Sequence, residues 1–111
     1  MVEERAKARL PRRPRAAVVA RLTLLFRRNG YVRWQDEERL TGEGGQVYKK
    51  GNEVRLVADS AKELAEVRRL LVAAGFKPGR PFVKGRQYRQ PVYGKLAVAR
   101  FLELVGEAPV H

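Results

Sequence analysis

Residues 53–75, which read EVRLVADSAKELAEVRRLLVAAG, decide the fold. Side chains alternate from Glu53 to Ala58 in the pattern of a strand with one buried face. Ser60 followed by Glu63 forms a capping box that opens a helix, and Gly75 ends that helix. The segment therefore predicts a strand followed directly by an amphipathic helix.

Before this segment, a helix is predicted over Arg15–Arg28, because apolar residues recur at helical spacing with few polar residues between them. We expect this helix to be buried on most sides. Asn29-Gly30 supplies a left-handed stop. Tyr31–Trp34 predicts a short strand, and a polar loop follows it.

Two hairpins are also predicted. The first joins Val47–Lys50 to the strand of the opening segment through Gly51-Asn52, a dipeptide suited to a tight turn. The second turns at Gly85 and continues as an alternating strand over Arg86–Tyr93. Pro91 indicates that this strand is an edge strand or lies near its end there.

Strand pairs that alternate with helices predict a single α+β domain over residues 16–111, with a small mixed or antiparallel sheet and helices packed on one face. Residues 1–15 are rich in basic side chains and hold two prolines, which predicts a flexible basic arm. The longest apolar stretch, Ala16–Phe26, is too short to span a bilayer, so we expect no membrane contact and a cytoplasmic location.

Composition excludes several kinds of chemistry. The 111 residues include no cysteine, and the only histidine is His111. Cysteine catalysis, disulfides and thiolate metal sites are thereby excluded, and a histidine-based triad or zinc site is disfavoured. The 24 Lys and Arg against 12 Asp and Glu give a net charge of +12, which attracts polyanions. Nine of these cations lie between Val67 and Leu102, where no acidic residue occurs.

The stretch LTLLFRRNG over Leu22–Gly30, followed by Tyr31-Val32, resembles the signature nonapeptide of the LAGLIDADG homing endonucleases. The resemblance covers about residues 16–105. It implies the αββαββα domain of that family, whose saddle-shaped sheet lies in the DNA major groove. The family's metal-binding acid is Asn29 here, which lacks the charge to hold Mg²⁺ strongly. The resemblance thus implies a DNA-binding scaffold, and it leaves a homodimer open.

A second resemblance covers about a third of the chain. Leu70–Phe76, Lys84–Tyr88 and Pro91–Gly94 are similar to the HicA toxin family, small RNA-cleaving proteins with a fold like that of double-stranded-RNA-binding domains. The catalytic histidine of that family is replaced by Gln87. This resemblance also implies binding without chemistry.

The second hairpin is the best candidate interface, because strand Arg and Gln side chains can donate to base edges while Lys and Arg neutralise phosphates. Cations on neighbouring strands extend that surface if their faces coincide, and the arm adds others. Basic residues also protect a solvated edge strand, which is the alternative interpretation. The predicted nucleic-acid-binding residues are Arg12, Arg13, Arg15, Arg33, Lys49, Arg55, Lys84, Arg86, Tyr88, Arg89 and Gln90.

Three further features carry weaker signals. Trp34, Tyr48 and Tyr93 have rings that could stack on unpaired bases, although a lone Trp in a short strand is more typical of a core. Asp36-Glu37-Glu38 is an acidic cluster typical of a solvated loop. The glycine-rich stretch 42–45 lacks the Lys and Ser/Thr of a phosphate-binding loop.

These observations predict a non-catalytic nucleic-acid-binding protein that prefers duplex DNA to RNA, associates with the nucleoid, and uses no catalytic residue, metal or cofactor. One alternative is a divergent Mg²⁺-dependent endonuclease that uses Asp36 or Glu37, or acids of a second subunit. Another is an RNA-binding, ribosome-associated module. A third is a domain that binds an acidic protein.

Overall fold

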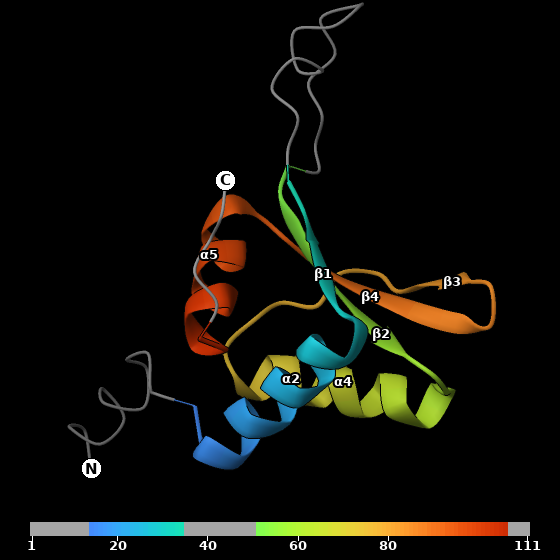
Figure 1. The fold of residues 1–111 in the computed structure, drawn as a ribbon, viewed down its shortest axis with the longest axis horizontal. Coiled ribbons are helices and arrows are strands. Elements are labelled where there is room, and N and C mark those ends of the chain that lie inside the picture. Colours follow the sequence, from blue (N-terminus) through green and yellow to red (C-terminus); the bar gives the residue numbers. More distant parts are fainter. Residues whose placement is uncertain (1–13, 35–50, 107–111) are drawn as a thin grey trace, which may run out of the picture.

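A helix, two strands, a helix, two strands and a helix follow one another in the computed structural model, which describes residues 14–34 and 51–106 (Figure 1). This order confirms the predicted α+β class. The elements are α2 (Ala16–Asn29), β1 (Tyr31–Arg33), β2 (Glu53–Ala58), α4 (Ala61–Ala73), β3 (Phe82–Lys84), β4 (Gln87–Tyr93) and α5 (Lys95–Leu104).

The four strands form one antiparallel sheet in the order β1-β2-β4-β3. Two hairpins, β1–β2 and β3–β4, therefore meet along their inner strands. Because β1 and β4 occupy both edges of β2 at Glu53–Arg55, the predicted tight hairpin at Gly51-Asn52 is wrong. The turn dipeptide indicated a reversal but could not specify the partner strand. The strand predicted over 47–50 lies outside the described residues.

β4 is an inner strand, so the edge position suggested by Pro91 is wrong, whereas its position near the strand end is confirmed. Pro91 lies opposite Arg55 of β2. On the other side, pairing with β3 ends at Arg89, and the Pro91 carbonyl accepts a hydrogen bond from the Gly79 N–H at 2.8 Å. The missing N–H of Pro91 faces this side, where no ladder bond needs it.

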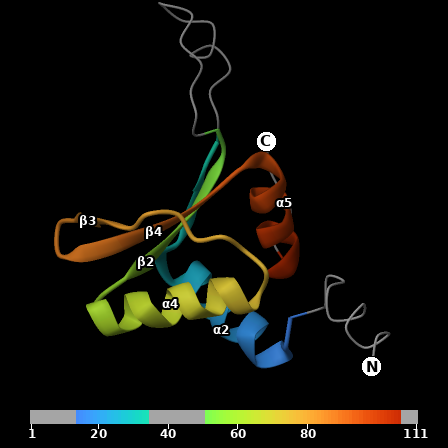
Figure 2. The ribbon, with the colours of Figure 1, turned by 180° about the vertical axis from the view of Figure 1, so that it is seen from behind.

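The core lies between the sheet and the helices. Val54 and Leu56 of β2 and Val92 of β4 are buried in one cluster with apolar side chains from all three helices. Figures 1 and 2 show α2 and α4 side by side against the sheet, with α5 beyond the end of β4. The sheet face that holds these three residues is therefore the covered face.

Local signals explain both ends of α4. The Ser60 Oγ accepts a hydrogen bond from the Glu63 N–H at 3.0 Å, as the capping box predicts. Gly75 adopts a φ of 91°, and the Phe76 N–H donates to the Leu71 carbonyl at 2.8 Å. This is the left-handed C-terminal cap that glycine favours.

α2 differs from its prediction in two ways. Gly30 has an extended backbone, with φ −79° and ψ 164°, so it is not a left-handed stop. Its lack of a side chain matters for space, because a Cβ there would lie 2.7 Å from the Phe26 Cδ1. The helix is also less buried than expected: Leu22 and Leu25 are its buried residues, while Leu24 is 57% exposed.

No helix among residues 14–34 and 51–106 is both long and apolar enough to cross a bilayer.

Candidate nucleic-acid interface

The sheet face opposite the helices, called the open face below, carries four of the eight candidate residues that the structure describes. Side chains alternate between the two faces along each strand, and residues directly opposite each other share a face. Within the described residues, the helices pack against the other face. The open face comprises Tyr31, Arg33, Glu53, Arg55, Val57, Phe82, Lys84, Gln87, Arg89, Pro91 and Tyr93.

Arg55 forms the centre of this face. Its Nε donates to the Glu53 Oε2 at 2.7 Å, and its Nη1 donates to the Tyr31 hydroxyl at 3.3 Å. Its guanidinium carbon lies 4.9 Å from the centre of the Phe82 ring. Glu53 and Arg55 are only 3% and 9% exposed. Arg55 is thus a buried cation that contacts Glu53, Tyr31 and Phe82 and holds these side chains together.

The Tyr31 phenol responds to this setting. Burial raises its pKa, but hydrogen bonds and positive charge from Arg55 and Arg89 outweigh burial and hold the pKa below its usual value of 10.0. The Tyr31 phenol oxygen is therefore a shared acceptor for arginines of the two inner strands.

In the second hairpin, the neutral amide of Gln87 lies between Asp59 and Arg89. The Gln87 Nε2 donates to the Asp59 Oδ1 at 2.9 Å, and the Arg89 Nη1 donates to the Gln87 Oε1 at 3.1 Å. The Arg89 Nε is buried and has no hydrogen-bond partner among the described residues. Arg89 as a whole is half-buried. Its charge is balanced less completely than that of Arg55.

The exposed cations lie at the periphery of the open face. Arg33 ends β1, Lys84 ends β3, and Arg86 lies in the turn after Gly85; all three are exposed. Most acidic side chains of the described residues form ion pairs with arginines, and one of these pairs lies on the open face itself. Ion pairs join Glu53 to Arg55, Asp59 and Glu63 to Arg28, and Glu66 to Arg21.

The structure brings four predicted residues onto the open face, namely Arg33, Arg55, Lys84 and Arg89, with Arg86 beside them. The predicted placement of Tyr88 and Gln90 at the interface is corrected by the structure. They lie opposite Ala58 and Leu56 and therefore face the helix side of the sheet. The prediction treated every polar residue of this strand alike, although alternation places only every second one on each face.

Gln90 has a structural role instead. It is fully buried, and its Oε1 accepts a hydrogen bond from the Arg68 Nη1 at 2.7 Å. Its Nε2 donates to the carbonyls of Gly79 and Pro91 at 2.7 and 2.9 Å. These bonds tie β4 to α4 and to the segment that leads into β3.

Arg15 is exposed at the start of α2 and is not part of the open face. The 14 residues of α2 separate it by about 20 Å from Gly30, where the chain enters the sheet. Arg12, Arg13 and Lys49 lie outside the described residues, as do Tyr48, Asp36 and Glu37.

The prediction missed Tyr31, Phe82 and Gln87, which also lie on the open face. Phe82 is 36% exposed, which is high for an aromatic ring. A signal was present in the sequence, because residues 31–33 and 82–84 both read aromatic, valine, basic. Trp34, by contrast, is partly buried against the core.

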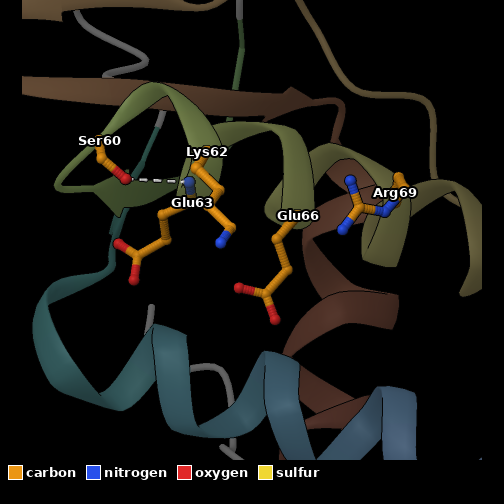
Figure 3. Close-up of a pocket in the computed structure, with 5 residues that line it drawn as sticks. All are labelled: Ser60, Lys62, Glu63, Glu66 and Arg69. Carbon is orange, nitrogen blue, oxygen red and sulfur yellow. Dashed lines mark hydrogen bonds between the residues drawn. The ribbon is translucent and has the colours of Figure 1, made fainter.

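A hollow of about 420 Å³ lies beside α4 and is lined by Ser60, Lys62, Glu63, Glu66 and Arg69. Figure 3 shows the side chains of Glu63 and Glu66 pointing toward α2. Both carboxylates are already bound there, by Arg28 at 2.6 Å and by Arg21 at 2.9 Å. The hollow is therefore a salt-bridged helix interface rather than a ligand site.

A second hollow, of about 650 Å³, lies between α2 and α5 and has a mainly apolar lining that includes Val19 and Leu104. Within residues 14–34 and 51–106, no group of three or more His, Cys, Asp or Glu could hold a metal ion. Asn29 ends α2, and its Oδ1 lies 3.5 Å from the Arg28 Nε. Its surroundings are cationic and unsuited to Mg²⁺.

The chain matches no protein-family model, no curated protein and no solved structure.

Proposed function

We propose that this protein binds nucleic acid, with duplex DNA favoured over RNA, through the open face of its sheet and the basic segment that precedes α2. The observation that carries this proposal is the separation of charge. Exposed cations lie at two opposite corners of the open face, whereas the acidic side chains named above are bound to arginines. A polyanion therefore meets a positive surface there.

Binding would depend mainly on phosphates. Arg33, Lys84 and Arg86 are exposed and would neutralise phosphates with release of counterions. Sequence preference would come from side chains that reach base edges, and a two-stranded β-ribbon fits the major groove. The half-buried Arg89, whose charge no carboxylate among the described residues neutralises, is the open-face residue best placed to donate to a base edge.

The proposed function is binding without catalysis. Asp59, just after β2, is exposed, accepts a hydrogen bond from Gln87 and pairs with Arg28. The one acidic residue within the strands of the open face, as far as the described residues extend, is Glu53, which is buried and bound by Arg55. A carboxylate in that state cannot act as a general base or attract a divalent cation. Such a role fits a cytoplasmic protein associated with the nucleoid.

The test is a fluorescence-anisotropy titration with duplex DNA, single-stranded DNA, an RNA hairpin and heparin at several salt concentrations. We expect duplex DNA to bind most tightly, with a steep fall of affinity as salt rises. The double variant Lys84→Gln/Arg86→Gln should lower the slope of log affinity against log salt by about two, close to 0.9 per phosphate.

The matched control is Lys62→Gln/Arg69→Gln, which removes the same charge from exposed positions on α4. It should leave the slope nearly unchanged. Equal losses from both double variants would mean that the charge acts generically. Tighter binding of heparin than of any nucleic acid would overturn the proposal and direct attention to an acidic protein partner.

A further inference from the structure

The two hairpins repeat one pattern on the open face. The outer strands read Tyr31-Val32-Arg33 and Phe82-Val83-Lys84, so each carries an aromatic and a basic residue on the open face, with valine between them. The inner strands begin Glu53-Val54-Arg55 and Gln87-Tyr88-Arg89, so each carries a Glu or Gln followed by an arginine. A helix follows each inner strand.

The registers of the two hairpins agree. Each aromatic residue lies opposite an arginine, Tyr31 opposite Arg55 and Phe82 opposite Arg89. Each outer cation lies opposite the Glu or Gln, Arg33 opposite Glu53 and Lys84 opposite Gln87. Within each copy, the arginine donates to that Glu or Gln, at 2.7 and 3.1 Å.

A pseudo-two-fold axis normal to the sheet relates the two copies. The strand order β1-β2-β4-β3, with β2 antiparallel to β4, is unchanged when the hairpins are exchanged. The central register obeys the same exchange, because Arg55 lies opposite Pro91 and Arg89 opposite Val57. The open face therefore has two similar halves, not one patch.

The outer cations are at opposite corners of this face. Three strand spacings across the sheet and six residues along β4 separate Arg33 from Lys84, about 25 Å if the sheet were flat. This separation is enough to reach both walls of a major groove, which is about 12 Å wide.

We infer that the open face is a two-fold site, in which each hairpin binds one strand of a nucleic-acid duplex and the axis of the sheet coincides with a dyad of the duplex. This inference rests on the proposed function. The two strands of a duplex are antiparallel and are related by two-fold axes, whereas a single strand has no such symmetry. Two equivalent basic corners thus match a duplex.

The halves are not identical. Glu53 binds and neutralises Arg55, whereas the neutral Gln87 leaves the charge of Arg89 available. The β3–β4 half should therefore hold its strand more tightly than the β1–β2 half. This difference allows a sharp test. On a duplex with one uncharged strand, the β3–β4 half should bind the strand that keeps its phosphate charges.

The experiment compares a short duplex with the same duplex in which methylphosphonates replace the phosphates of one strand. The wild-type chain should bind the half-neutral duplex more weakly, whichever strand is neutral. Arg33→Gln should lower affinity for the fully charged duplex by about five- to tenfold, the loss of one phosphate contact. It should cause no further loss on the half-neutral duplex, because the β1–β2 half already faces the neutral strand.

Lys84→Gln should weaken binding to both duplexes, and Lys62→Gln to neither. Arg33 and Lys84 are exposed, and circular dichroism will verify that the variants fold. An Arg33→Gln loss that is equal on both duplexes, or single-stranded DNA bound as tightly as duplex, would overturn the two-fold site while nucleic-acid binding stands. Failure of all nucleic acids to bind would refute the proposed function itself.

Discussion

The inner strands of the two hairpins place an arginine at equivalent positions and treat it differently. Arg55 of β2 is 9% exposed and is bound by the buried carboxylate of Glu53. Arg89 of β4 is half-buried and is bound by the amide oxygen of Gln87. The carboxylate of Glu53 thus neutralises Arg55 within the fold, whereas the neutral amide of Gln87 does not neutralise Arg89.

The covered face shows a second difference at a directly opposed pair. Leu56 of β2 is an ordinary core residue, whereas Gln90 of β4 makes three hydrogen bonds in the interior. The first hairpin is therefore ionic on its open face and apolar on its covered face. In the second hairpin, neutral polar groups occupy both positions.

The largest expected effect separates the two arginines. Arg55→Met leaves the Glu53 carboxylate buried without its partner, which should lower the free energy of unfolding by about 3–5 kcal/mol. Arg89→Met removes hydrogen bonds to two neutral groups, the Gln87 amide and the Tyr31 phenol, and should cost about 1–2 kcal/mol. Urea unfolding followed by circular dichroism measures both.

The double variant Glu53→Gln/Arg55→Met removes the stranded carboxylate and should recover much of the loss. Equal costs for the two arginines would break the comparison, because both would then be structural.

Gln90→Leu makes the covered face of the second hairpin resemble that of the first. It removes three hydrogen bonds and leaves Arg68 with the Gly79 carbonyl, at 3.0 Å, as its remaining partner. Unsatisfied buried groups of this kind should lower the free energy of unfolding by about 1–3 kcal/mol. Thermal unfolding tests this, and Arg68→Met/Gln90→Leu should be less destabilised than the sum of the single variants. A stabilised Gln90→Leu would mean that the network serves something other than the fold.

Gln87→Glu gives the second hairpin the carboxylate of the first. The new charge should bind Arg89 and cancel one cation, so duplex affinity should fall about tenfold. The variant also loses the hydrogen bond that Gln87 donates to Asp59 and brings two carboxylates together, which should lower the free energy of unfolding by about 1 kcal/mol. Anisotropy titrations measure this effect, and Gln87→Asn is the neutral control. Unchanged affinity would show that Arg89 contributes nothing to binding.

The smallest effect concerns how the end of β2 is anchored. Arg28 donates to the Val57 carbonyl at 3.0 Å and to the Glu63 carboxylate at 2.6 Å. The hydrogen bond from Arg28 holds the pKa of Glu63 below its usual 4.5. The pair stabilises the fold fully above that usual pKa, and the contribution disappears as pH falls toward the lowered pKa.

Glu63→Gln should therefore cost about 0.5–1 kcal/mol at pH 7, because the ion pair is partly exposed. The difference in stability from wild type should narrow as pH falls below 4.5 and through the lowered pKa of Glu63. Thermal melts between pH 3 and 7 give the profile, with Glu103→Gln as the control on α5. A gap that persists unchanged at pH 3 would assign the effect to the helix cap rather than to the ion pair.

Features set by residues close in the chain, such as helix ends, were predicted correctly from the sequence. Features set by the pairing of strands distant in the chain were not. Ser60, Glu63 and Gly75 set the ends of α4 by local hydrogen bonds, and those ends were predicted. The partner of β2 depends on which strands meet in space, which Gly51-Asn52 does not encode. Because Val92 is a core residue, alternation along β4 places Gln90 in the interior, a signal that the basic character of the hairpin concealed.

For the candidate site, exposed cations at strand ends were predictable, and Arg33 and Lys84 are examples. The match between Tyr31 and Phe82 was visible only as similar triplets. Its meaning depends on the registers, which place each ring opposite an arginine.

The lengths of the two connections have a consequence for folding. Two residues, with Gly85 at φ 64°, join β3 to β4, whereas residues 34–52 separate β1 from β2. Closing the longer connection costs about 2 kcal/mol more in chain entropy. The β3–β4 hairpin can therefore form early from local contacts, and β1 should join the sheet late. A complete chain that refolds would thus assemble first the half of the open face whose arginine is less neutralised.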